Sequence, residues 1–350
     1  MIHLSPSEPA SVKKMAEEIY NFCDNMMFAV ESEFKCDFEF DNIVVCGMGG
    51  SAIGGEIIKN CIIDEIGFPI VIQRFPELPK WVNERTLAII CSYSGNTNET
   101  LEMFDQALKK GCKIVAMTSG GKVMEIGRKH SITIMEMEKN IQPRSSLGYG
   151  IGYMALIMDV VCGTKCRDDI IKCMPSLMKF RDKLSEKGGI AESIALATQD
   201  KIPIIYAATN ISAAATRWKN QINENSKAIS FAGAIPEFNH NDIAGWAEGD
   251  LRDKCLPIFL YESSAPKATR SMIKAAISSL EGWGLEVNVV KIKGKTVMDR
   301  MLRSIMIGDY VSLYLAAIHQ KNPEEVDSIA ELKERLKALN DSPSKRNRRK

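Results

Sequence analysis

The chain has few histidines and no paired cysteines of the kind that bind metal ions. Its 350 residues include only four histidines, which are far apart in the sequence (His3, His130, His240 and His319). Its ten cysteines form no Cys-x-x-Cys pair, and Cys162-x-x-x-Cys166 has no matching second pair. We therefore expect no metal site, and we expect free thiols in a reducing cytoplasm.

Neither sign of charge is in excess, and no apolar run is long. The 45 basic residues nearly balance the 44 acidic ones, which gives a formal net charge of +1. This balance gives no basis for nucleic acid binding. The sequence contains no evident signal peptide and no apolar span of about 18 residues. We therefore expect a cytoplasmic protein with no nucleic acid partner and no membrane partner.

The first motif joins a short apolar stretch to a glycine-rich turn. Residues 43–46 are apolar and largely β-branched, as in a strand that is buried on both faces. Gly47, Gly49 and Gly50 follow, then Ser51, and residues 52–61 are expected to form a helix. Free N–H groups and the helix dipole favour an anion at such a helix start. We expect this turn to hold one end of a phosphorylated substrate.

Two other interpretations of this turn remain open. Gly47-x-Gly49-x-x-Ala52 formally matches a dinucleotide fingerprint, although Arg74 stands where an acidic residue is expected. No Gly-Lys-Ser or Gly-Lys-Thr follows the turn, which excludes a nucleoside triphosphate loop there. A tight turn without any ligand is the third possibility. The turn alone does not distinguish among a dinucleotide, another phosphate and a structural role.

Strands alternate with helices along the chain. The expected later strands are residues 69–75, 86–91, 113–117, 132–135, 202–208, 256–261 and 286–291. This alternation predicts an α/β protein with doubly wound parallel sheets. In such sheets, ligands bind at the carboxyl ends of the strands, where the polar turns are expected to lie.

The second motif is Ser-Tyr-Ser-Gly-Asn-Thr at residues 92–97. Ser92, Ser94 and Thr97 bring three hydroxyl groups to one helix start. Neutral donors and free N–H groups can hold a phosphate monoester without a lysine. One hydroxyl would suffice to cap the helix, and we therefore favour a ligand role.

Two residues with acid–base capacity occur between asparagines. Glu224 lies in Asn-Glu-Asn, and His240 lies in Asn-His-Asn. Taken singly, a glutamate or a histidine is more often structural. Together they supply what an aldose–ketose isomerase needs, because a carboxylate can move a proton between C1 and C2 and an imidazole can open the sugar ring. Arg144 follows Pro143 and can stabilise an enediolate oxygen, although a lone arginine is usually a surface ion-pair partner.

The two turns together resemble the sugar isomerase (SIS) domain, which binds phosphosugars. The matching sequences are Gly-Met-Gly-Gly-Ser-Ala-Ile-Gly-Gly and Ser-Tyr-Ser-Gly-Asn-Thr. This resemblance displaces the dinucleotide interpretation. It implies two αβα-sandwich domains of SIS type, the second with a degenerate phosphate turn. It also implies that the phosphate and sugar ligands are Gly49, Gly50, Ser51, Ser92, Ser94 and Thr97.

Two further features resemble those of the bifunctional phosphoglucose/phosphomannose isomerases. They are the Pro-Arg loop and the sequence Asn-Glu-Asn followed by Glu-x-Asn-His-Asn. The resemblance implies that Glu224 is the proton-transfer base, His240 the ring opener and Arg144, next to Pro143, the enediolate stabiliser. In that family the histidine comes from the neighbouring subunit, which implies a homodimer. Lys333 matches a weaker pattern in the last helix, typical of any amphipathic helix, and is the candidate for assisting ring opening.

The implied activity needs no cofactor and interconverts glucose 6-phosphate or mannose 6-phosphate with fructose 6-phosphate through a cis-enediolate. Val326 and Ser328 lie near the place that the family associates with mannose acceptance. A non-catalytic SIS module that senses a phosphosugar is the main alternative. An aminosugar-phosphate synthase is less favoured, because the chain has no amino-terminal cysteine and no glutaminase domain.

The expected organisation is an N-terminal helical segment (1–38), a phosphate-binding SIS domain (39–165), a connecting helix (166–187), a second SIS domain with the C-terminal helix (188–338) and a disordered basic tail (339–350).

Overall fold

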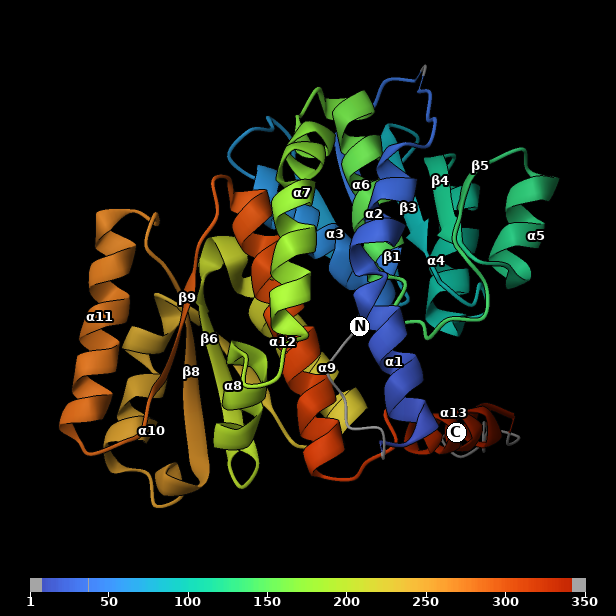
Figure 1. Ribbon diagram of the computed structural model, residues 1–350. Coiled ribbons are helices and arrows are strands. Elements are labelled where there is room, and N and C mark those ends of the chain that lie inside the picture. The colour runs from blue at the N-terminus through green and yellow to red at the C-terminus, as the bar shows by residue number, and fades with distance from the viewer. Residues whose placement is uncertain (1–7, 37, 342–350) are drawn as a thin grey trace, which may run out of the picture.

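Two separate parallel β-sheets, one from each half of the chain, form the framework of the fold (Figure 1). The computed structural model describes residues 8–36 and 38–341. The first sheet has the order β2-β1-β3-β4-β5 and consists of β1 (Asn42–Gly47), β2 (Ile70–Gln73), β3 (Thr86–Cys91), β4 (Lys113–Thr118) and β5 (Thr133–Glu136). The second has the order β7-β6-β8-β9 and consists of β6 (Ile202–Ala208), β7 (Phe231–Ile235), β8 (Cys255–Glu262) and β9 (Asn288–Ile292). Every pairing is parallel, which confirms the expected α/β class with two parallel sheets.

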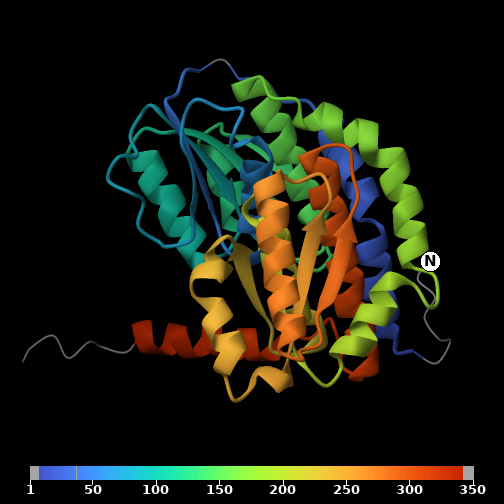
Figure 2. The same cartoon turned by 90° about the vertical axis from the view of Figure 1, so that its left-hand side faces the viewer.

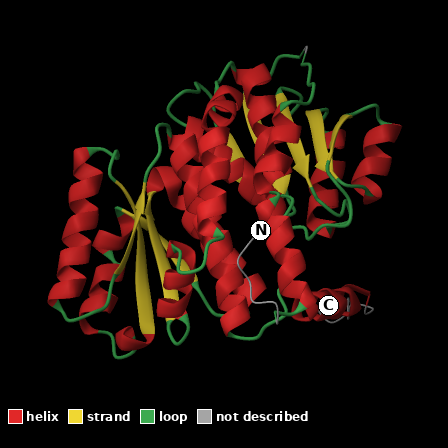
Figure 3. Cartoon of the chain, viewed as in Figure 1, coloured by secondary structure: helices red, strands yellow, loops and turns green. Residues whose placement is uncertain are grey.

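Helices fill the space between the two sheets and cover their outer faces (Figure 1, Figure 3). The central layer contains α1 (Ala10–Tyr20), α2 (Phe22–Val30), α3 (Gly49–Ile62), α6 (Leu147–Cys162), α7 (Cys166–Leu184), α8 (Ile190–Thr198), α9 (Ser212–Ser226) and α12 (Val297–Ile318). The outer helices are α4 (Asn98–Lys109) and α5 (Gly121–Lys129) on the first sheet, and α10 (Asp242–Glu248) and α11 (Lys267–Gly282) on the second. The last helix, α13 (Asp327–Asp341), lies below α1 in Figure 1 and extends beyond the body of the molecule in Figure 2.

The apolar strands are buried on both faces, which explains their nearly continuous apolar sequences. In the first sheet, Val45 and Ile89 face the central helices, whereas Val44 and Ile90 face α4 and α5. The same central core includes Ile205 of the second sheet. One core therefore joins both halves of the chain and fixes the first sheet relative to the second.

The structure differs from the sequence expectations at several element ends. The edge strand β7 was not expected, and α3 begins at Gly49, so that Gly49 and Gly50 form its first turn. In the segment expected to be helical as far as residue 38, α2 ends at Val30. Helix α13 reaches Asp341, within the expected tail, while residues 1–7 and 342–350 of the expected terminal segments lie outside the described residues. The limits of the domains stay a prediction.

Helix α12 corrects the expectation that no apolar span is long. By length and composition alone, its 22 residues are apolar enough to cross a membrane. However, 83% of its most apolar stretch is buried inside the protein. It packs against α9, where the indole of Trp218 donates a hydrogen bond to the backbone oxygen of Ser304 over 2.6 Å. The core helix of a globular domain meets the same criterion, and this is the position that α12 occupies.

Candidate active site

The two polar turns of the first half meet at the carboxyl ends of neighbouring strands. Strands β1 and β3 are paired, with Gly47 opposite Cys91 at their ends. The hydroxyl of Ser51, in the first turn of α3, accepts a hydrogen bond from the backbone N–H of Tyr93 over 3.2 Å. Gly95 has a φ of +68°, and an added Cβ would lie 1.9 Å from the Gly120 carbonyl oxygen, so this turn requires glycine.

The predicted phosphate ligands form one group of hydroxyls around the start of α4. Ser92 is buried, and its hydroxyl donates to Thr97 Oγ1 over 3.1 Å. Ser94 is exposed, and its Oγ accepts the N–H of Asn96 over 3.3 Å. Thr97 occupies the N-cap position of α4, but its side chain makes no capping hydrogen bond. The capping interpretation therefore does not account for this hydroxyl.

The Pro-Arg loop packs directly against the first glycine turn. A Cβ added to Gly50 would lie 3.4 Å from Arg144 Cα and 3.5 Å from the Pro143 carbonyl oxygen. The side chain of Pro143 is exposed, whereas Arg144 is only 4% exposed. The start of α3 therefore lies in packing distance of the loop that carries the arginine.

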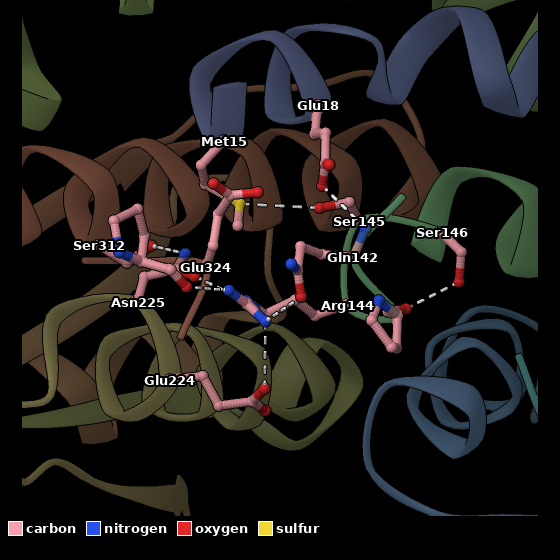
Figure 4. A network of polar contacts seen from close by, with 12 residues as sticks. Met15, Glu18, Gln142, Arg144, Ser145, Ser146, Glu224, Asn225, Ser312 and Glu324 are labelled. Carbon is pink, nitrogen blue, oxygen red and sulfur yellow. Dashed lines mark hydrogen bonds and ion pairs between the residues drawn. The ribbon is translucent and has the colours of Figure 1, made fainter. Parts of the chain in front are cut away.

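Arg144 is the centre of a polar network that joins three segments of the chain: its own loop, the end of α9 and the segment after α12 (Figure 4). Its Nε donates to Asn225 Oδ1 over 2.7 Å, its Nη1 donates to Gln142 Oε1 over 3.2 Å, and its Nη2 donates to the backbone oxygen of Pro323. Glu224 lies 3.7 Å from Nη1 as an ion-pair partner. Burial lowers the pKa of the Arg144 guanidinium, and the opposite charge of Glu224 counteracts this shift.

Glu224 lies in the last turn of α9 and remains accessible, with 32% of its side chain exposed. The ammonium group of Lys227 donates to the backbone oxygen of Glu224 over 2.6 Å and to that of Asn322 over 2.7 Å. Burial and the nearby charge of Arg144 lower the pKa of Lys227. The carboxylate is therefore close to two cations but is not enclosed by a tight ion pair.

His240 lies at the other end of the second sheet. It ends the short helix η2 (Glu237–His240), which follows the carboxyl end of β7, and its side chain is exposed. Helix α9 runs back from the carboxyl end of β6, and the hydroxyl of Ser230 after it bonds the backbone of Pro203 where β6 starts. A strand of five residues, as β7 has, spans about 16 Å. Within one chain, Glu224 and His240 therefore lie toward opposite ends of the second sheet.

Lys333 is exposed on α13. Among residues 8–36 and 38–341, no hydrogen bond or ion pair connects it with Arg144 or Glu224. The structure thus gathers most of the predicted site into one continuous region and leaves His240 and Lys333 outside it. The gathered residues are Gly49, Gly50, Ser51, Ser92, Ser94, Thr97, Pro143, Arg144 and Glu224.

The sequence analysis missed the residues that support Arg144. Asn225 belongs to the Asn-Glu-Asn motif, so its position in the sequence was a usable signal. Arg217 gave no such signal, because its partner Asp309 is 92 residues away. These two form a buried pair with two hydrogen bonds of 2.9 Å, and Arg217 also donates to the Arg144 backbone oxygen over 2.9 Å.

No group of three or more histidine, cysteine, aspartate or glutamate side chains suited to a metal ion occurs in the part of the chain that the structure describes. The polar groups of the site are hydroxyls, backbone N–H groups, one guanidinium and one carboxylate. This arrangement can bind an anion at the two turns and can transfer a proton beside a stabilised oxyanion.

Comparison with known proteins identifies relatives of this chain. Residues 189–336 match a family described as the bacterial phospho-glucose isomerase C-terminal SIS domain. The chain is 32% identical over 347 residues to a bifunctional phosphoglucose/phosphomannose isomerase of Caldicellulosiruptor bescii, covering 93% of this chain and 100% of that protein. It is 31% identical over 327 residues to the protein of the same name in Aquifex aeolicus, covering 93% and 98%.

A solved structure shares the fold at low sequence identity. The C-terminal domain of glucosamine-fructose-6-phosphate aminotransferase from Francisella tularensis superposes with a TM-score of 0.71 at 11% identity, covering 89% of this chain and 98% of that one. This likeness bears on the fold alone. The resemblance noted from the sequence motifs is confirmed by the curated relatives, which match over most of their length. The chain is therefore an isomerase enzyme of the bifunctional phosphoglucose/phosphomannose isomerase family.

Proposed function

We propose that this enzyme interconverts glucose 6-phosphate and mannose 6-phosphate with fructose 6-phosphate through a cis-enediolate. The observation that carries the proposal is the continuity of the site: the hydroxyl turns adjoin Gly50, Gly50 adjoins Arg144, and Arg144 adjoins Glu224. The phosphate binds at Ser51, Ser92, Ser94 and Thr97, and C1 and C2 of the open-chain sugar extend toward Arg144 and Glu224.

In the proposed reaction, the Glu224 carboxylate removes the proton from C2 of the aldose, which the neighbouring carbonyl makes acidic. The electron pair of that C–H bond forms the C1–C2 double bond of the enediolate, whose oxygen charge the Arg144 guanidinium stabilises. A proton passes from the C2 hydroxyl to the C1 oxygen, Glu224 then returns its proton to C1, and the C2 carbonyl of the ketose results. The partial exposure of Glu224 and its 3.7 Å separation from Arg144 support this role, because the carboxylate is accessible to substrate.

His240 opens the sugar ring as part of a homodimer in which each chain supplies the histidine to the site of the other. The separation of about 16 Å along β7 supports this proposal, since an imidazole from the same chain does not meet Glu224. Helix α13 also leaves an apolar face exposed, which a second chain would cover. Its exposed aliphatic residues are Ile329, Leu332, Leu336 and Leu339.

Lys333 assists ring opening in the same proposal, delivered by α13. The start of that helix borders a groove of ≈ 560 Å³, which Val326 and Ser328 line together with Lys227. Lys227 donates a hydrogen bond to the backbone of Glu224, so the groove lies close to the proposed base. This position supports a role for Val326 and Ser328 in accepting the epimer at C2. Mannose 6-phosphate activity depends on this groove and on rotation about the C2–C3 bond.

A coupled assay with fructose 6-phosphate, glucose 6-phosphate and mannose 6-phosphate tests the proposal directly. We expect turnover of all three, because one base can take the C2 proton from either epimer. A phosphosugar sensor would bind fructose 6-phosphate in a calorimetric titration without forming an aldose phosphate. Binding without turnover would therefore favour the sensor, and turnover of the glucose pair alone would remove mannose 6-phosphate from the substrates.

A further inference from the structure

Asn225 follows the proposed base directly, and its amide joins Arg144 to α12 (Figure 4). Its Oδ1 accepts from Arg144 Nε over 2.7 Å, and its Nδ2 donates to Ser312 Oγ over 2.9 Å. The Ser312 hydroxyl donates to the Asp309 backbone oxygen over 2.7 Å, so only its lone pairs face the amide. A reversed amide would place two donors against each other at Arg144. The orientation of Asn225 is therefore fixed from both sides.

Within the described part of the chain, all the acceptors at hydrogen-bond distance from the Arg144 guanidinium are neutral. They are the amides of Asn225 and Gln142 and the backbone carbonyl of Pro323. The carboxylate of Glu224 is 3.7 Å away, beyond the usual distance of a hydrogen bond. The plane of the guanidinium is thus fixed while its positive charge is left without a directly bonded anion.

The neighbouring Arg217 shows the opposite arrangement. It forms two hydrogen bonds of 2.9 Å with the carboxylate of Asp309, and both side chains are buried. A bidentate pair of this kind orients an arginine and also neutralises it. Arg144 and Arg217 are both buried and are joined by the hydrogen bond from Arg217 to the Arg144 backbone oxygen, yet their side chains differ in the charge of their acceptors. Arg144, which has neutral acceptors, is the one that lies beside the proposed base.

We propose that Asn225 is a positioning residue that aims the Arg144 guanidinium at the enediolate oxygen and keeps it free of a directly hydrogen-bonded anion. This inference rests on the proposed function. Arginine has five N–H donors, and the three neutral acceptors occupy three of them. Two donors remain on the Nη atoms, and they are available to an oxyanion of the substrate.

The test is Asn225→Asp, which keeps the shape of the side chain and places a carboxylate against Arg144 Nε. Because the guanidinium then has an internal anion, we expect kcat to fall about 10²-fold, as for the loss of an oxyanion donor. The KM for fructose 6-phosphate should change little, since the phosphate binds elsewhere. An aldonic acid phosphate, whose carboxylate imitates the enediolate charge, should lose affinity by a factor similar to that in kcat.

Asn288→Asp on β9 is the matched control, because it adds the same charge outside the site and should leave kcat unchanged. Thermal unfolding of each variant shows whether the fold is intact. If the role of Asn225 were purely structural, Asn225→Asp would lower the stability of the protein and raise KM. The ratio of analogue affinity to substrate affinity would then be unchanged. That result would overturn the inference, as would wild-type kinetics in a folded Asn225→Asp.

Ser312→Ala decides the question if Asn225→Asp does not fold. It retains Asn225 and removes the hydrogen bond that orients the amide, so kcat should fall about 2- to 10-fold, the value of one neutral hydrogen bond. An unchanged kcat in folded Ser312→Ala would contradict the inference. Wild-type protein that turns over none of the three sugar phosphates would contradict the proposed function instead, so the two failures are distinguishable.

Discussion

Glu224 is the single residue on which the proposed chemistry depends most. Its side chain is partly exposed and lies 3.7 Å from the Arg144 guanidinium, and its backbone oxygen accepts a hydrogen bond from Lys227. Its position could be predicted from the sequence, because an acid between two asparagines is unusual for a solvated helix face. The same holds for the hydroxyl turn at residues 92–97. The buried pair of Arg217 and Asp309 could not be predicted, because a contact across 92 residues has no local pattern.

Replacing Glu224 with glutamine tests its role as the base. The amide keeps the size of the side chain and cannot accept the C2 proton, so kcat should fall roughly 10²- to 10⁴-fold. Binding of fructose 6-phosphate, measured by calorimetric titration, should persist. Glu248→Gln, at an exposed position in α10, is the control and should retain full activity. Near-normal turnover in Glu224→Gln would remove this residue from the mechanism.

The hydroxyls of Ser94 and Thr97 give a second prediction at this scale. Their combined replacement by alanine should raise the KM for all three sugar phosphates by about 10-fold or more, since each bond to a charged group is worth about 1.5–3 kcal/mol. Helix α4 should be unaffected, because Thr97 makes no capping bond. Ser263 and Ser264, exposed after β8, supply a matched double alanine control. An unchanged KM would mean that the phosphate binds elsewhere.

At the scale of elements, the site depends on the packing of α9 against α12. These helices carry Glu224 and Asn225 on one side and Ser312 on the other. Strands β1 and β3 could be recognised from the sequence because they are uniformly apolar. Strand β7 could not, because alanine and glycine are poor strand formers and Phe231 is exposed. Its pairing with β6, from Ile204 opposite Phe231 onward, is a tertiary effect.

Gly308→Ala tests this helix packing. An added Cβ would lie 2.2 Å from Cδ1 of the fully buried Trp218. Overpacking of this kind lowers the free energy of unfolding by about 1–3 kcal/mol, and the melting temperature measured by calorimetry should fall. Gly282→Ala is the control, because an added Cβ there meets no atom within 4 Å. Equal stability of the two variants would show that the α9–α12 contact adjusts without cost.

At the scale of the whole molecule, the proposed site needs two chains. The sequence indicated this only through the family resemblance, because no local pattern shows which surfaces of a folded chain meet. The structure supplies a physical reason, since β7 separates Glu224 from His240. In the proposed mechanism, a compact unit of two sheets with one shared core therefore requires a second chain to supply the ring-opening histidine.

Mixing two inactive variants tests the shared site. Glu224→Gln and His240→Ala should each be nearly inactive alone. When the two are unfolded together and refolded in equal amounts, half of the dimers are mixed, and one of the two sites in each is intact. About a quarter of wild-type activity should return. Light scattering on the active protein is the complementary measurement, and an active monomer or the absence of recovery would contradict the shared histidine.

The bond from Arg144 to the Pro323 carbonyl spans 179 residues of sequence. During translation, the arginine is therefore made long before the last group that seats it. We therefore expect a nascent chain to lack this anchor of the guanidinium until the segment after α12 has left the ribosome, however early its first sheet has folded. Products of premature termination before residue 323 should consequently hold Arg144 less firmly, even where they retain the two turns proposed to bind phosphate.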